Sequence, residues 1–296
     1  MRSLLAGLVC VGVLSGCGGG GGVPPVSESP EPRRSPEAEV SRTPSRAPVV
    51  RVPRGVRASY VVFDRAAGRV VVERRPRQTF RSASLVKILI ALDHMAENRV
   101  SAADRELLRV MLRSSDDRAA TEFWRRGGQK KILERMAPKA GLRETAPPPA
   151  DKPGFWGYTA LSARDVMQTY RYLLDGAPEA HREFVLEQLS KATRCGTDGF
   201  DQSFGIPAAL ERPWAVKQGW SGFGDAPAGP CRGARPAAAR PGGGPDLGIG
   251  RPVLHTSGVV GERKVVVVLT LHPAGSSFGR AAARITALTE QVWRAS

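Results

Sequence analysis

The sequence has few of the residues that build metal sites, and its basic residues form no dense block. It contains four histidines and four cysteines in 296 residues, and the histidines are far apart, without the spacing of metal ligands. We therefore expect no metal and no cofactor. The formal net charge is +16, but the arginines are scattered and no nucleic-acid-binding module is recognisable. The composition disfavours nucleic acid as a partner and favours anionic lipid or an acidic cell-wall polymer.

The apolar run at the N-terminus, residues 4–14, is too short to span a bilayer as a helix. Arg2 precedes it, and small residues end it at Leu14-Ser15-Gly16-Cys17, which is typical of a cleaved export signal. The tetrad resembles the lipobox of bacterial lipoproteins, and this resemblance implies lipid attachment to Cys17. We expect a signal peptide at residues 1–16 and a protein anchored by lipid on the extracytoplasmic face of the cell membrane. The alternative is an ordinary secretory peptide and a secreted protein.

Composition divides the rest of the chain into a tether and one folded domain. Residues 17–54 are rich in Gly, Pro and Ser and bury too little apolar surface to fold, so we expect a disordered tether. Residues 55–296 form the predicted domain, which we expect to be a monomer, with a low-complexity insertion near 224–250. Cys195 and Cys231 lie in this exported domain. An oxidising compartment would allow them to pair, although the sequence does not establish that they are close.

Strand patterns lie at both ends of the domain and helical patterns lie between them. Two β-branched runs separated by a short turn predict an N-terminal hairpin, and apolar residues at helical spacing predict the central helices. The predicted strands cover 59–64, 69–73, 214–217 and 265–271, and a last helix covers 278–293. We expect an α+β fold, in which N- and C-terminal strands share an antiparallel sheet beside an α-helical lobe.

A serine and a lysine stand three residues apart at the start of the first helical run. On a helix this spacing brings the Ser84 hydroxyl and the Lys87 amine to one face. A buried amine beside a serine can act as the base that activates it as a nucleophile. Alone this spacing is a weak signal, because a serine and a lysine often occur three residues apart by chance.

Two further motifs follow in the chain, Ser115-Asp116-Asp117 and Lys217-Gln218-Gly219. Together with Ser-x-x-Lys, in this order, they resemble the Ser-Asp-Asn and Lys-Thr-Gly motifs of penicillin-binding proteins and class A β-lactamases. A Phe-Arg-x-x-Ser phrase at residues 80–84 and a Gly-Gly pair at 127–128 extend the similarity. We therefore identify the chain as a member of the serine β-lactamase and penicillin-binding protein superfamily.

The resemblance implies a role for each residue. Ser84 attacks a carbonyl, Lys87 accepts its proton, and Ser115 passes a proton to the leaving nitrogen. The backbone N–H groups of Ser84 and Trp220 form the oxyanion hole. The substrate is bound by four further residues, of which Lys217 attracts a carboxylate: Asp117, Lys217, Gly219 and Ser221.

The chain departs from the family pattern at three places. Asp117 replaces the asparagine of Ser-Asp-Asn, and its carboxylate could pair with Lys87. Gln218 replaces a threonine, for which Ser221 is a possible substitute. The family's Glu-x-x-Leu-Asn phrase, whose glutamate activates the deacylating water, is missing from residues 143–158, and Glu144 lies too close to the preceding helix end to replace it. We expect slow release of an acyl group.

These features predict a lipid-anchored serine hydrolase that forms an acyl-serine on a β-lactam or on a D-Ala-D-Ala-like peptide of peptidoglycan. The alternative is a cell-envelope binding lipoprotein that keeps the fold and little or no catalysis. Binding of a penicillin to Ser84 distinguishes the two, because only the hydrolase forms a covalent adduct.

Overall fold

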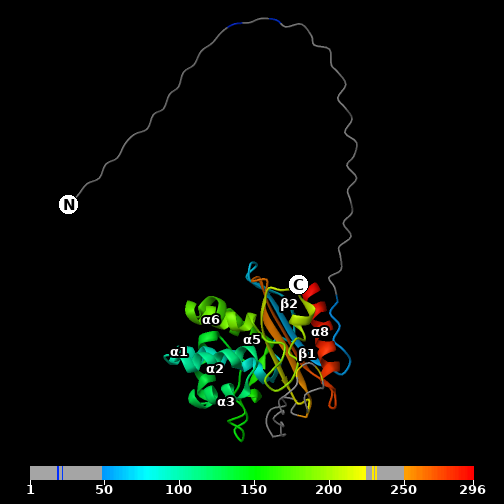
Figure 1. Ribbon diagram of the computed structural model, residues 1–296. Helices are drawn as coiled ribbons and strands as arrows, with labels where there is room; N and C mark the ends of the chain where they lie inside the picture. The colour runs from blue at the N-terminus through cyan, green and yellow to red at the C-terminus, as the bar shows by residue number, and fades with distance from the viewer. Residues whose placement is uncertain (1–18, 20–21, 23–48, 225–228, 230, 232–249) are drawn as a thin grey trace, which may run out of the picture. The chain divides into compact units, whose positions relative to one another are not determined.

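The structure is a computed structural model that describes residues 19, 22, 49–224, 229, 231 and 250–296 (Figure 1). The expected signal peptide, Cys17, nearly all of the tether and most of the 224–250 insertion lie outside these residues. Among the described residues no helix is both long and apolar enough to cross a membrane.

A five-stranded sheet runs through the domain, and every neighbouring pair of strands in it is antiparallel. Its order is β2-β1-β7-β6-β5, so the C-terminal strand β7 lies between strands from the two ends of the chain. This confirms the predicted α+β fold. The strands are β1 (Arg57–Asp64), β2 (Arg69–Arg74), β5 (Trp214–Ser221), β6 (Val253–Val260) and β7 (Lys264–Leu271).

Both faces of the sheet are covered, which explains the continuous valine run in β7. Val265 and Val267 pack into the core shared with the helical lobe. Their neighbours Val266 and Val268 point to the other face and pack with the C-terminal helix α8 (Phe278–Arg294). Figure 1 shows the sheet between α8 and the lobe.

The lobe is built around α1 (Lys87–Glu97), which is buried from Lys87 to Met95. Polar caps fix the helices on either side of the Ser115 turn. Ser101 and Asp104 form a capping box at the start of α2, and Asp116 accepts a hydrogen bond from the Ala119 N–H at 2.8 Å at the start of α3. The other helices are α2 (Ala102–Arg113), α3 (Asp117–Arg126), α4 (Lys130–Ala140), α5 (Ala163–Arg171), α6 (Glu179–Ser190) and the short α7 (Ile206–Ala209).

A second, two-stranded sheet was not expected from the sequence. Its strands are β3 (Thr79–Arg81), just before the serine motif, and β4 (Ala160–Ser162). Three residues are too few to show an alternating pattern. Ser162 also caps α5, and Asp165 in the first turn of α5 accepts hydrogen bonds from the N–H groups of Arg143 and Glu144, so the start of α5 anchors the beginning of the 143–158 segment.

Cys195 and Cys231 form a disulfide, with their Cα atoms 5.3 Å apart. Cys195 begins the loop of residues 195–204, which precedes β5, and Cys231 follows β5. The disulfide therefore ties this loop to the chain beyond the strand that carries Lys217.

We predict that replacing both cysteines by alanine lowers the free energy of unfolding by roughly 3–4 kcal/mol, because the crosslink restricts the unfolded chain. The 36-residue separation sets this magnitude. Urea denaturation of the oxidised protein and of the double variant measures the change. Added reductant should destabilise the unmodified protein and leave the double variant unchanged; equal stability of the two proteins would contradict the prediction.

Candidate active site

Ser84 lies in a short 3₁₀ turn, η1 (Ala83–Val86), immediately before α1. The preceding residue, Ala83, has φ of +45°, a left-handed conformation that costs energy for a residue with a Cβ. This turn packs against β5 at Gly219, where an added Cβ would lie 3.1 Å from the Ser82 carbonyl oxygen. The lack of a side chain at Gly219 thus allows β5 to pack closely against the serine turn.

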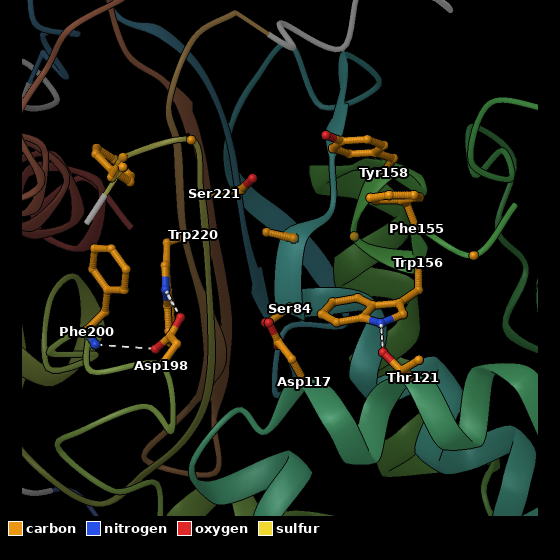
Figure 2. Close-up of a pocket in the computed structure, with 16 residues that line it drawn as sticks. Ser84, Asp117, Thr121, Phe155, Trp156, Tyr158, Asp198, Phe200, Trp220 and Ser221 are labelled. Atoms are coloured by element: carbon orange, nitrogen blue, oxygen red, sulfur yellow. Dashed lines mark hydrogen bonds between the residues drawn. The ribbon is translucent and has the colours of Figure 1, made fainter. Parts of the chain in front are cut away.

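A cavity of about 600 Å³ opens in front of Ser84. Figure 2 shows its two walls. One is formed by Phe155, Trp156 and Tyr158 from the 143–158 segment, and the other includes Phe200 and Trp220.

Two buried lysines meet at one serine behind this cavity. The Lys217 Nζ donates to the Ser115 Oγ at 2.8 Å, and the Lys87 Nζ lies 3.3 Å from the same oxygen. The Lys87 Nζ also donates to the Ser115 carbonyl oxygen. Ser115 has φ of +58°, and this strained turn between α2 and α3 presents both oxygens to the lysines. The structure therefore brings together Lys87, Ser115 and Lys217, as expected.

The charges at this junction are unequally compensated. Burial lowers the pKa of Lys217 well below its ordinary value, and the nearby Lys87 lowers it further, while Asp117 and Asp198 act in the opposite direction. The Lys87 Nζ forms an ion pair with Asp117 Oδ1 at 2.6 Å. It also lies 4.7 Å from the centre of the Trp156 ring.

The contact predicted between Ser84 and Lys87 is not made. In the described part of the chain, the hydrogen bonds of Lys87 go to Ser115 and Asp117 and none goes to Ser84. The reason is that an ionised carboxylate is a stronger acceptor for an ammonium group than a hydroxyl. Asp117 thus pairs with the proposed base, which the sequence raised as a possibility for this position.

The residues predicted to form the oxyanion hole or to bind substrate divide into two groups. Ser84, Asp117, Trp220 and Ser221 line the cavity. Lys217 and Gly219 do not line it; Lys217 is 1% exposed and bonded to Ser115. Gln218 donates to the carbonyl oxygens of Gln202 and Phe204, so its amide supports the loop before β5.

Glu144 and His255 have structural roles. Glu144 accepts a hydrogen bond from Ser162 at 3.3 Å and is absent from the cavity lining. His255 is buried in β6, where burial lowers its pKa to about 3 and its ring contacts the Arg81 carbonyl oxygen. Among the described residues, no group of three or more His, Cys, Asp or Glu side chains is arranged to hold a metal.

Sequence reasoning missed the aromatic walls and Asp198. The Phe-Trp-Gly-Tyr run at residues 155–158 was an available signal, because Phe155 is 51% exposed in a loop and a run of aromatics in a polar loop favours binding. Asp198 gave no such signal, since it reaches the cavity through the folding of residues 195–204. Its carboxylate accepts hydrogen bonds from the Trp220 indole N–H at 2.7 Å and from the Phe200 N–H at 3.3 Å.

Solved structures with this arrangement of elements include a class A β-lactamase from Mycobacterium abscessus. It matches with a TM-score of 0.58 at 18% identity, over 81% of this chain and 94% of that one. A mutant of PBP-A, solved as an acyl-enzyme complex with penicillin G, matches with a TM-score of 0.58 at 16% identity, over 82% and 90%. These likenesses show the fold.

Sequence comparison gives a nearer relationship. Lipoprotein LppW of Mycobacterium tuberculosis is 36% identical over 239 residues, which cover 77% of this chain and 67% of LppW. The LppW protein of Mycobacterium bovis matches equally. No protein family model matches the chain. The chain therefore belongs to the family of lipoprotein LppW and has the fold of the serine β-lactamases and penicillin-binding proteins.

Proposed function

We propose that this protein is a lipid-anchored serine hydrolase that forms an acyl-enzyme on Ser84. The observation that carries the proposal is the junction at Ser115, whose Oγ is reached by both Lys87 and Lys217. The proton of Ser84 would pass to Lys87 when the ion pair with Asp117 opens, and Lys87 already contacts Ser115, which would deliver a proton to the leaving group. A structural serine does not need two buried amines, each of which costs several kcal/mol to remove from water.

In the proposed reaction the Ser84 Oγ attacks a carbonyl carbon in the cavity and its proton passes to Lys87. The developing oxyanion is held by the backbone N–H groups of Ser84 and Trp220. Both residues line the cavity, and the packing of Gly219 on the serine turn places the next residue of β5 beside Ser84. Ser115, held by Lys217, then protonates the leaving nitrogen.

The proposed substrates are β-lactams and D-Ala-D-Ala-like peptides. The fold shared with β-lactamases and with PBP-A supports this choice. The aromatic walls fit the apolar side chain of such a substrate, because flat rings bury large apolar areas. Attachment of lipid to Cys17 would place the domain at the membrane face where peptidoglycan peptides lie, and the lipoprotein relative supports this location.

A binding lipoprotein with little catalysis is the second candidate. The ion pair between Lys87 and Asp117 favours it. In this pair the Lys87 amine is engaged with Asp117 and not with Ser84, whose proton it would have to accept. The two candidates differ in whether the pair opens when a substrate enters.

The first test is incubation with a fluorescent penicillin, followed by intact-mass analysis. We expect one covalent adduct, and we expect none in Ser84→Ala, because Ser84 is the proposed nucleophile. Ser276→Ala, a change in the turn before α8 and outside the cavity lining, is the matched control and should keep the adduct. Lack of any adduct at high protein concentration would support the binding lipoprotein instead.

The second test replaces Asp117 by asparagine. We expect acylation of Ser84 to become roughly fivefold faster, because a half-exposed ion pair worth about 1 kcal/mol no longer occupies the Lys87 amine. The Asp117 side chain is 54% exposed, so the substitution should not unfold the domain. The rate of adduct formation is measured by quenching the reaction at set times and reading the fluorescence of the labelled protein on gels. Slower acylation in Asp117→Asn would show that the carboxylate assists the reaction.

A further inference from the structure

Hydrolysis of an acyl-serine needs a base that takes a proton from the attacking water. A carboxylate suits this step when it lies in the same cavity as the ester. Glu144 does not, because it is bonded to Ser162 outside the cavity lining. Asp117 lines the cavity but is already paired with Lys87.

Asp198 is the other carboxylate in the cavity lining. Figure 2 draws it on the wall opposite the Phe155 side, with Ser84 between the two walls. Its partners are an indole N–H and a backbone N–H, both neutral donors. These two bonds fix the carboxylate, and within residues 49–224 and 250–296 no ion pair neutralises it.

The indole that holds Asp198 belongs to Trp220, the residue expected to supply the second N–H of the oxyanion hole. Asp198 therefore lies on the same wall of the cavity as the residue expected to complete the oxyanion hole. Burial raises the pKa of Asp198, Asp117 raises it further, and Lys87 opposes this. These influences place Asp198 within electrostatic reach of the Lys87–Asp117 pair and make its carboxylate more basic than an exposed one.

We propose that Asp198 is the general base that activates water for release of the acyl group from Ser84. This role rests on the proposed function, because it needs an acyl-serine to act on. It supplies the step for which the sequence showed no residue, from a loop before β5 that is held by the Cys195–Cys231 disulfide.

The step balances without a co-reactant. The water oxygen bonds to the acyl carbon while one water proton passes to the Asp198 carboxylate. Collapse of the tetrahedral intermediate breaks the bond between that carbon and the Ser84 Oγ, which takes up the proton from Asp198 through solvent. Asp198 is then ionised again, and the products are a carboxylic acid and the free Ser84 hydroxyl.

The test follows the decay of a preformed adduct. The full mature protein is acylated with a fluorescent penicillin, excess probe is removed, and the adduct is followed by intact mass. We expect Asp198→Asn to form the adduct at the rate of the unmodified protein and to lose it about 10²- to 10⁴-fold more slowly. Asparagine keeps an acceptor for the Trp220 indole, so the geometry is preserved.

The matched control is Asp201→Asn. It removes a carboxylate from the same loop, but Asp201 bonds to Arg194 and Ser203 and does not line the cavity. Its adduct should decay at the unmodified rate. Unchanged decay in Asp198→Asn would overturn the role of Asp198 and leave acylation standing. Absence of an adduct in the unmodified protein would overturn the proposed function and this role with it, so the two failures are distinguishable.

A second readout separates a base from a structural residue. Only the ionised carboxylate accepts a proton, so decay in the unmodified protein should slow as the pH falls through the raised pKa of Asp198. In Asp198→Asn this pH dependence should be absent, and its absence from the unmodified protein would overturn the proposal.

A raised pKa also means that ionised Asp198 opposes folding at neutral pH, so Asp198→Asn should melt no lower than the unmodified protein.

Discussion

The site depends on the burial of two amines around one hydroxyl. Lys87 and Lys217 are almost fully enclosed, and both reach Ser115. Removing a charged amine from water costs several kcal/mol unless a counter-charge is present, and two amines also repel each other. Asp117 supplies one counter-charge at 2.6 Å from Lys87. Lys217 has no such partner at contact distance among the described residues, and its pKa is lowered accordingly.

This imbalance gives the two lysines different chemistry. Lys217, whose pKa is lowered, donates to the hydroxyl of Ser115, the proposed proton donor. Lys87 is instead paired with the exposed carboxylate of Asp117. Entry of a substrate displaces water from the cavity and strengthens every charge interaction in it. Asp117 lines the cavity, so a molecule that enters it would meet the Lys87–Asp117 pair directly.

The surrounding fold is arranged to hold this cluster. Strained backbone at Ala83 and Ser115 aims both serines, and the packing of Gly219 on the Ser84 turn sets the distance between β5 and the nucleophile. The two cavity walls come from segments that are fixed at a distance from the site. Asp165 anchors residues 143–145, and the disulfide anchors the loop that carries Asp198. Short, irregular segments thus present the side chains while regular elements hold them.

The sequence by itself determined four strands of the five-stranded sheet, the central helices and the order of the three motifs, because these follow from hydrophobic period and from local spacing. It also predicted that Ser84, Lys87, Ser115 and Lys217 belong to one site, and of these the structure joins Lys87 and Lys217 at Ser115. Only the tertiary structure decided that Lys87 contacts Asp117 instead of Ser84, that Lys217 is withdrawn from the cavity, and that Asp198 faces it. These outcomes depend on burial and on competition between partners far apart in the chain, which no local pattern in the sequence records.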